Sequence, residues 1–188
     1  MNLPALKMTA AEYLAWEATQ EVRHEFWRGE VFAMVGARRV HGLVALNLAA
    51  ALKSHLKGTP CRAFIEGQKV QVAQDAIFYP DVFVTCNEDD LRTDVVFKQP
   101  KLVVEVLSDS TQAFDRSLKF AAYRQLASLE EYVLVDPDSR VVEVFRRNER
   151  GNFELLDQTG AAALELASVG LQLPMAELFD GVEAADEA

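Results

Sequence analysis

Two apolar segments of the chain each carry one carboxylate, Asp81 and Glu105. The segment 79–85 reads Tyr-Pro-Asp-Val-Phe-Val-Thr, and the segment 101–107 reads Lys-Leu-Val-Val-Glu-Val-Leu. Short runs rich in β-branched residues predict strands. An ionised carboxylate inside a buried strand is costly unless a cation or a hydrogen-bond donor meets it. Two such carboxylates on neighbouring strands therefore predict a metal site.

A structural role for each carboxylate is the competing interpretation. Asp81 could cap its strand or accept hydrogen bonds from turn amides, and Glu105 could pair with a buried arginine. Either residue alone favours the structural role. The two together, with a helix that follows, favour the metal site.

The elements that must position these carboxylates are predicted from local patterns. A capping box formed by Thr9 and Glu12 begins a helix over 10–18. Apolar residues at three- and four-residue steps predict a long amphipathic helix over 39–57, which should pack on a sheet. A third helix begins after the hydroxyl-rich segment 108–111.

Runs of β-branched and aromatic residues predict the strands. A hairpin over 25–35 turns at Arg28-Gly29. Besides the two segments that carry the carboxylates, strands are expected at 61–65, 70–73, 131–136, 140–146, 153–157 and within 164–173. Strands interleaved with helices predict an α/β domain with a mixed central β-sheet flanked by helices.

The composition is that of a globular protein with its own core, since 50% of the 188 residues are hydrophobic and 26% are charged. We expect a single domain over 1–178 and a disordered acidic tail over 179–188. No apolar run reaches the roughly 20 residues that cross a bilayer, and no secretory signal is visible, so a cytoplasmic location without membrane contact is expected. Cys61 and Cys86 are expected to be buried apolar residues without chemistry.

The net charge of −10 counts against non-specific binding of nucleic acid, which depends on Lys and Arg to neutralise phosphates. Basic clusters are the candidates for a DNA-facing surface, although most charge runs are solvated faces. These clusters are Arg38-Arg39, Lys53 with Lys57, and Arg146-Arg147.

The order of polar residues along 8–150 carries a family resemblance. The matching residues are Glu25, His41, Pro80-Asp81, Glu105-Val106-Leu107-Ser108, Ser110-Thr111, Asp115, Lys119, Tyr123 and Glu131-Tyr132. In this order the chain resembles the Uma-two family of restriction-type endonucleases, within the PD-(D/E)XK nuclease superfamily. The resemblance implies a restriction endonuclease-like core and a metal-dependent endonuclease that hydrolyses DNA phosphodiester bonds.

The resemblance also implies roles for particular residues. Asp81, Glu105 and the backbone carbonyl of Val106 would bind Mg²⁺, or Mn²⁺ in its place, because these are hard oxygen ligands. Lys119 would orient the attacking water or stabilise the transition state, and Glu25 would serve as an auxiliary carboxylate.

The chain departs from the superfamily at Leu107, where the second strand usually carries the catalytic lysine. The Uma-like pattern places that lysine on the following helix, at Lys119. A helix that begins directly after a strand lies over the end of that strand, so a long lysine stem can reach back to it. The other interpretation is that Lys119 only pairs with Asp115 on the helix surface, at an i, i+4 spacing.

Four residues are supporting candidates. His41 could touch phosphate or a metal-bound water, or it could serve in packing or capping. Tyr123 lies four residues after Lys119 and could donate to a phosphate or a carboxylate, or pack under the sheet. Asp115 lies one helical turn before the lysine, and Thr111 could cap the helix or bind phosphate at its N-terminus.

DNA is therefore the expected partner, and a homodimer is expected because a two-fold dimer supplies one site for each strand. The alternative is a catalytically silent nuclease-fold module that binds nucleic acid or a protein partner in a regulatory role. The acidic composition and the missing strand lysine favour that alternative. An enzyme for another phosphorylated substrate would need a Gly-rich phosphate cradle, and none of the nine glycines forms one.

Overall fold

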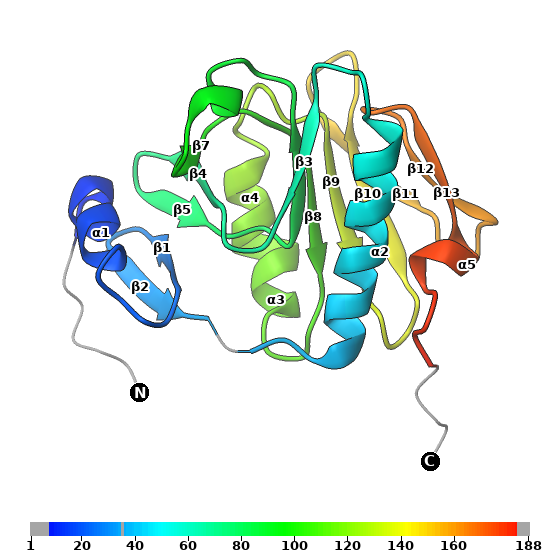
Figure 1. Cartoon of the computed structure of the whole chain (residues 1–188), viewed down its shortest axis with the longest axis horizontal. Coiled ribbons are helices and arrows are strands. Elements are labelled where there is room, and N and C mark those ends of the chain that lie inside the picture. Colours follow the sequence, from blue (N-terminus) through cyan, green and yellow to red (C-terminus); the bar gives the residue numbers. More distant parts are fainter. Residues whose placement is uncertain (1–7, 35, 184–188) are drawn as a thin grey trace.

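A six-stranded sheet lies at the centre of the computed structural model, which describes residues 8–34 and 36–183 (Figure 1). The strand order is β11-β10-β9-β8-β6-β3. β8 and β9 pair in parallel and the other neighbours pair antiparallel, so the sheet is mixed, as predicted. The bounds are β3 (Arg62–Ile65), β6 (Val82–Thr85), β8 (Pro100–Val106), β9 (Glu131–Val135), β10 (Val142–Arg147) and β11 (Phe153–Asp157).

Helices flank this sheet because its strands are apolar on both faces (Figure 1). Val82 and Val104 point into a core that they share with α2 (Arg39–His55). Phe83 and Val103 point to the opposite face, as alternation along a strand requires. That second core includes residues of a helical run composed of α3 (Gln112–Phe114), the π-helical turn η2 (Asp115–Lys119) and α4 (Phe120–Tyr123).

A second sheet, in the order β2-β1-β5-β4-β7, joins the N-terminal part of the chain to this body. α1 (Ala10–Glu17) packs on it through a small core of Tyr13, Phe26 and Ile77. Because Phe26 points toward α1, the neighbouring Glu25 points to the other side of its strand. The bounds are β1 (His24–Trp27), β2 (Glu30–Ala33), β4 (Lys69–Ala73), β5 (Ala76–Phe78) and β7 (Val96–Phe97).

The predicted elements of the N-terminal half are confirmed. The Thr9 hydroxyl accepts from the Glu12 amide at 3.3 Å, and the Glu12 carboxylate accepts from the Thr9 amide at 2.8 Å, which completes the capping box. Arg28 and Gly29 both have positive φ, of 51° and 88°, as a two-residue hairpin turn requires. None of the described helices is long and apolar enough to cross a membrane.

The C-terminal segment is more ordered than expected. A hairpin of β12 (Ala163–Leu166) and β13 (Leu171–Pro174) leads into α5 (Met175–Leu178). Phe179 and Val182 are then buried in the same core as α2, and the Asn47 amide donates to the carbonyl of Asp180 at 2.9 Å. The expectation of a disordered tail is therefore wrong for residues 179–183, because these apolar side chains have a surface to cover. Residues 184–188 lie outside the described part of the chain.

The expectation for the two cysteines is also corrected. Cys61 and Cys86 form a disulfide. β3 and β6 pair antiparallel with Arg62 opposite Thr85, so the two cysteines occupy the next pair of positions in the same register. Their side chains are neighbours only because of this long-range pairing.

Candidate active site and metal centre

Asp81 and Glu105 occupy opposite positions at the ends of neighbouring strands. Val82 of β6 lies opposite Val104 of β8, and the same antiparallel register places Asp81 opposite Glu105. Residues in such positions have Cβ atoms about 4.5–5.5 Å apart. The amide of Glu66 donates to the Asp81 carbonyl at 3.2 Å, which continues the row to the end of β3. Three acidic residues therefore lie side by side across one end of the central sheet.

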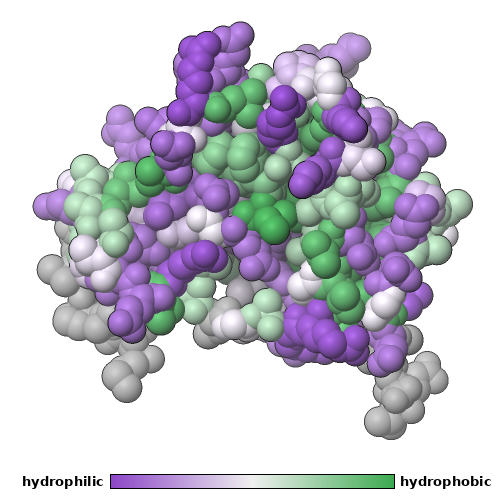
Figure 2. Space-filling model, viewed as in Figure 1, coloured by the Kyte–Doolittle hydropathy of each residue, from purple (hydrophilic) through white to green (hydrophobic). Residues whose placement is uncertain are grey.

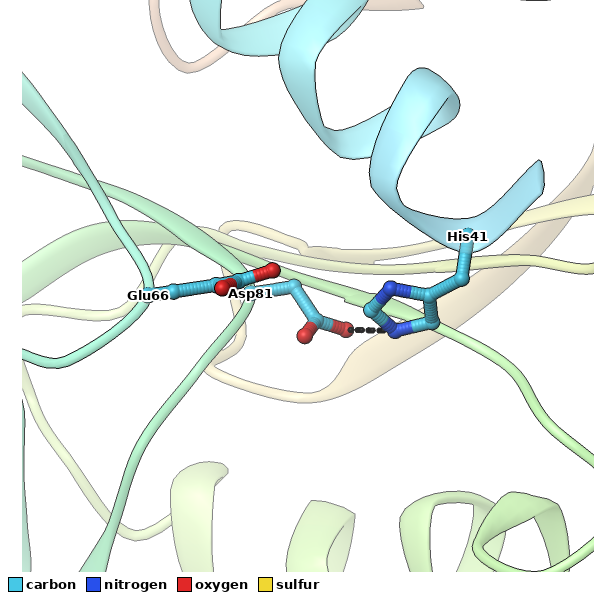
Figure 3. A group of neighbouring side chains, drawn as sticks. All are labelled: His41, Glu66 and Asp81. Carbon is cyan, nitrogen blue, oxygen red and sulfur yellow. Dashed lines mark ion pairs between the residues drawn. The ribbon is translucent and has the colours of Figure 1, made fainter. Parts of the chain in front are cut away.

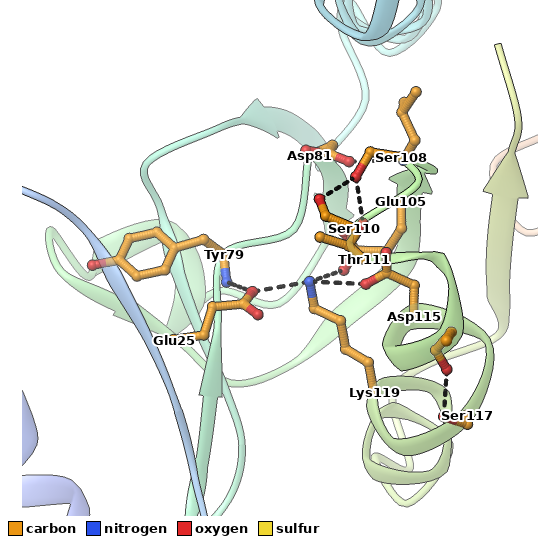
Figure 4. A network of polar contacts seen from close by, with 12 residues as sticks. Glu25, Tyr79, Asp81, Glu105, Ser108, Ser110, Thr111, Asp115, Ser117 and Lys119 are labelled. Carbon is orange, nitrogen blue, oxygen red and sulfur yellow. Dashed lines mark hydrogen bonds and ion pairs between the residues drawn. The ribbon is translucent and has the colours of Figure 1, made fainter. Parts of the chain in front are cut away.

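The ammonium of Lys119 lies among carboxylates that come from three parts of the chain (Figure 4). Its Nζ atom is 2.9 Å from Oε1 of Glu25, 3.1 Å from Oε1 of Glu105 and 3.5 Å from Oδ1 of Asp115. Only 6% of the Lys119 side chain is exposed. The lysine thus reaches from the helix back to the end of β8, and it is more than the surface partner of Asp115.

The π-helical turn η2 carries both Asp115 and Lys119, and both are buried. Insertions of this kind are rare and occur often at functional sites. The hydroxyl of Tyr132, on β9, donates to the Asp115 carbonyl at 3.0 Å, which fixes the turn against the sheet. Leu107 is buried in the core beneath this helix, so the position that usually carries the strand lysine faces apolar side chains here.

Glu25 reaches the cluster from the N-terminal hairpin. Its Oε1 atom accepts a hydrogen bond from the Tyr79 amide at 3.1 Å. Tyr79 lies two residues before Asp81, just ahead of β6. The hairpin thereby contributes a carboxylate that neither the central sheet nor its helices supply. Figure 2 shows the face of Figure 1 in space-filling form, indented along its lower edge between this hairpin and the N-terminal end of α2.

The electrostatics of the cluster are those of one cation facing several anions. Burial is the largest influence on the pKa of Glu105 and raises it. The Lys119 charge lowers this pKa, whereas Asp115, Asp81 and Glu25 raise it further, so that it lies well above its usual range. Burial lowers the pKa of Lys119, but Glu105, Glu25 and Asp115 more than offset this, so its pKa is also well above the usual range. The Lys119 ammonium is therefore charged, and the carboxyl groups of Glu25, Glu105 and Asp115 surround it.

The carboxylate oxygens around Lys119 are of the kind that binds a divalent cation. The Oε1 atom of Glu105 is buried and makes no hydrogen bond with any described residue, and the contact with Lys119 is an ion pair without hydrogen-bond geometry. Hard cations such as Mg²⁺ prefer carboxylate and carbonyl oxygens. An additional positive charge at this strand end would neutralise the excess of carboxylates and engage the free oxygen.

A second polar group adjoins the first at Asp81 (Figure 3). Oδ2 of Asp81 lies 3.2 Å from Nε2 of His41 and accepts from the Val106 amide at 2.7 Å. His41, Glu66 and Asp81 each offer a ligand atom, and these atoms all lie within 4.8 Å of one another. Burial lowers the pKa of His41, but Asp81, Glu66 and the Val106 backbone more than offset it, so the pKa is raised.

The supporting candidates differ in what they contact. Tyr123 is fully buried, and burial followed by the charge of Glu105 raises its pKa well above the usual range. Its hydroxyl makes no hydrogen bond within the described residues. Thr111 stands at the N-cap of α3, but its hydroxyl lies 3.0 Å from the Ser108 hydroxyl and caps no helix amide. The capping role predicted for Thr111 is therefore wrong.

Glu66 is the one member of these two groups that sequence reasoning missed. It follows β3 directly and precedes Gly67, so locally it resembles an ordinary turn residue. Only the pairing of β3 with β6 brings it beside Asp81. The sequence did offer one signal for Glu66: it is an acidic residue at the end of a predicted strand. Its role becomes visible only if that strand is paired with the one that follows Asp81.

Two of the predicted basic clusters are engaged within the chain. Arg38 forms a bidentate pair with Asp138, at 2.7 and 3.0 Å. Arg146 lies 2.7 Å from the buried carboxylate of Glu131, and Arg147 donates to four backbone carbonyls. These contacts within the chain account for the positions of the three arginines, so no contact with DNA is needed to explain them.

Comparisons with known proteins agree with this architecture. Two uncharacterised proteins of Synechocystis sp. are similar in sequence: slr1290 is 33% identical over 182 residues, which cover 96% of each chain, and sll1609 is 32% identical over 143 residues, which cover 74% of this chain and 81% of that protein. A crystal structure described as that of a "putative nuclease belonging to DUF820" from Anabaena variabilis superposes with a TM-score of 0.77 at 20% identity. The superposition covers 94% of this chain and 99% of that one. The predicted α/β fold is confirmed.

The family expectation is confirmed as well. The family model of Uma2, described as "Putative restriction endonuclease", matches residues 10–176. This match spans the N-terminal helix, the central sheet and both polar groups. The chain belongs to the Uma2 family.

Proposed function

We propose that the chain is a metal-dependent endonuclease that hydrolyses DNA phosphodiester bonds. One observation carries the proposal: a buried lysine ammonium contacts Glu105 and Glu25 at the strand end where Asp81 lies opposite Glu105. Burying the charge of Lys119 is costly, so its place among carboxylates at this strand end needs a reason other than stability. Membership of a family described as restriction endonucleases adds to this support.

The carboxylates of Asp81 and Glu105 and the carbonyl of Val106 are the proposed ligands of Mg²⁺, for which Mn²⁺ can substitute. When bound, the ion would lower the pKa of a coordinated water and polarise the scissile phosphate. The ammonium of Lys119 would stabilise the negative charge that develops on the phosphate oxygens, since it is held in place before the substrate arrives. Glu25 orients that ammonium from the opposite side, and Asp115 from one helical turn away.

The experiment is a cleavage assay on supercoiled and linear DNA with Mg²⁺, Mn²⁺ or EDTA. Asp81→Asn, Glu105→Gln and Lys119→Gln should each abolish metal-dependent cleavage. Lys101→Gln is the matched control, because Lys101 lies on the same strand as Glu105 but pairs with Glu130 at the surface. Cleavage that survives in Glu105→Gln, or that needs no metal, would contradict the proposal.

The silent-module alternative has its own supporting observation, the engagement of Arg38 and Arg146 by carboxylates of the same chain. A protein with its arginines satisfied internally has less charge to offer to phosphates. If the wild type cuts no DNA with either metal, the silent module is favoured instead, whether or not the protein binds a labelled duplex.

We also propose that the enzyme acts as a homodimer in the cytoplasm, where cellular DNA is accessible. A two-fold dimer would present one site to each strand of a duplex. Light scattering should give a mass of twice 20.9 kDa. Supercoiled DNA should then pass to the linear form with little accumulation of nicked circles, whereas a monomer would accumulate them.

A further inference from the structure

We infer that Glu17 and Tyr79 are positioning residues, which hold Glu25 against the Lys119 ammonium without touching the substrate. The inference deepens the proposed function and rests on it, since Lys119 belongs to the same site. Glu17 is the last residue of α1 and Tyr79 directly follows β5, so both lie outside the strands of the central sheet. Neither is an ion-pair partner of Lys119 within the residues that the structure describes.

The Glu17 carboxylate is buried and ties two separate segments together. Only 2% of its side chain is exposed. Its Oε1 atom accepts from the Tyr79 hydroxyl and from the His24 amide, both at 2.8 Å, and its Oε2 atom lies 3.1 Å from Nδ1 of His24. Burial, followed by the hydrogen bond to Glu17, raises the pKa of Tyr79, so the hydroxyl remains a donor at neutral pH. One side chain therefore fixes His24 at the start of β1 and Tyr79 just after β5.

These two segments flank Glu25. His24 precedes it directly in β1, and the Tyr79 amide donates to its Oε1 atom at 3.1 Å. The Nζ atom of Lys119 lies 2.9 Å from the same oxygen. Figure 4 shows this carboxylate between the Tyr79 amide and the Lys119 ammonium, with the Tyr79 ring directed away from the lysine. A shift of the Tyr79 backbone would therefore displace the oxygen that contacts the ammonium.

The stability of α1 does not account for Glu17. Burial of a carboxylate is costly, and an apolar side chain of similar volume in its place is often neutral or stabilising. The C-terminal end of a helix is also the negative end of its dipole. Glu17 nevertheless ends α1, whose last turn contains no basic residue, and it lies one helical turn after Tyr13 of the small core. The hydrogen bonds that reach both flanks of Glu25 give this carboxylate a role beyond the packing of α1.

Lysine ammonium signals in ¹⁵N NMR test the inference on the metal-free full chain, without DNA. The Lys119 ammonium is shielded from water, so its protons should exchange slowly and give a resolved signal, which Lys119→Gln assigns by its absence. Tyr79→Phe removes the hydroxyl but keeps the amide that binds Glu25. In Glu17→Gln, the amide cannot accept from both partners as the carboxylate does. Each variant should shift the Lys119 signal, and the double variant should shift it by less than the sum, because both act through one shared hydrogen bond.

Tyr13→Phe is the matched control. Its buried hydroxyl belongs to the same small core but donates to the His24 carbonyl and not to Glu17. Urea unfolding should show similar losses of stability for Tyr13→Phe and Tyr79→Phe, whereas only Tyr79→Phe should shift the Lys119 signal. In the cleavage assay, Tyr79→Phe should lower kcat between about tenfold and a hundredfold, since a catalytic group displaced by a distant change slows the chemistry. The KM for DNA should stay unchanged.

The outcomes separate the inference from the proposed function. A Lys119 signal that stays in place in either Tyr79→Phe or Glu17→Gln, or that moves equally in Tyr13→Phe, would overturn the inference. An unchanged kcat of Tyr79→Phe in an enzyme that cuts DNA would overturn it as well. A wild type that cuts no DNA, while the Lys119 signal moves as expected, would overturn the proposed function alone.

Discussion

The Nζ atom of Lys119 lies 3.1 Å from Oε1 of Glu105, although the two residues belong to a helix and to a strand that are separated by a hydroxyl-rich loop. Both side chains are almost fully buried. Leu107, two residues after Glu105, points into the apolar core. The helix thus supplies the cation at this strand end, where the strand itself offers only a leucine.

Lys119→Met should destabilise the metal-free protein at neutral pH by about 3–5 kcal/mol, because breaking a buried ion pair leaves its partners uncompensated. The loss should shrink as the pH falls and Glu105, whose pKa is raised by burial, takes up a proton. Urea unfolding at pH 7.5 and pH 5 measures both effects. Lys101→Met, which removes the partly exposed Lys101–Glu130 pair, should cost at most about 1 kcal/mol. Equal losses in the two variants would show that Lys119 is not buried among these charges.

The raised pKa of Glu105 predicts a pH dependence of stability. Burial is its first cause, Lys119 opposes the shift, and the neighbouring carboxylates add to it. Between the ordinary value of 4.5 and the raised pKa, the folded state holds a proton that the unfolded state has lost. The free energy of unfolding therefore falls as the pH rises through this window in EDTA.

Glu105→Gln should remove that slope. The free energy of unfolding of the variant should therefore increase relative to that of the wild type as the pH rises above 4.5. Glu12→Gln is the control of opposite sign, because hydrogen bonds from Thr9 lower the pKa of Glu12. The stability that Glu12 contributes is present at neutral pH and is lost as the pH falls. Unfolding curves that show parallel pH dependences for wild type and Glu105→Gln would contradict the assignment.

Local patterns were sufficient for most of the fold, because helices and hairpins depend on neighbours in sequence. The capping box at Thr9, the turn at Arg28-Gly29 and the amphipathic helix 39–57 all follow from spacings of a few residues. Asp81 and Glu105 stood out for the same reason, since a carboxylate within or directly before an apolar strand is conspicuous locally.

What the sequence could not reveal depends on strand register. Glu66 joins Asp81, and Cys61 bonds Cys86, only because β3 pairs with β6 in one particular alignment. A shift of one residue would point all of these side chains to the other face. Val182 was assigned to a tail for a similar reason, because its apolar contact lies on a helix more than a hundred residues away. Whether Asp81, Glu105 and Lys119 catalyse a reaction stays a prediction.

The Cys61–Cys86 disulfide should stabilise the fold by about 3.5 kcal/mol, as loop-closure entropy predicts for a sequence separation of 25 residues. Addition of dithiothreitol should therefore lower the free energy of unfolding of the wild type by that amount. The Cys61→Ala/Cys86→Ala double variant should be insensitive to the reductant. Identical unfolding curves for oxidised and reduced wild type would show that the bond adds nothing to the paired strands.

Arg147 should contribute to the stability of the fold and not to the affinity for DNA. Its guanidinium donates to the carbonyls of Leu129 and Leu126 at 2.7 and 2.6 Å and lies 4.5 Å from the centre of the Phe153 ring. Arg147→Ala leaves these carbonyls without their charged donor, so we expect a loss of about 2 kcal/mol in urea unfolding.

Arg150→Ala is the matched control for Arg147→Ala, because Arg150 lies in the neighbouring turn, is exposed and carries the same charge. It should change the free energy of unfolding by less than about 0.5 kcal/mol. Fluorescence anisotropy with a labelled duplex should show no greater loss of DNA affinity in Arg147→Ala than in Arg150→Ala, since the Arg147 guanidinium is directed into the protein. A selective loss of DNA binding in a stably folded Arg147→Ala protein would instead place this arginine on the DNA-facing surface.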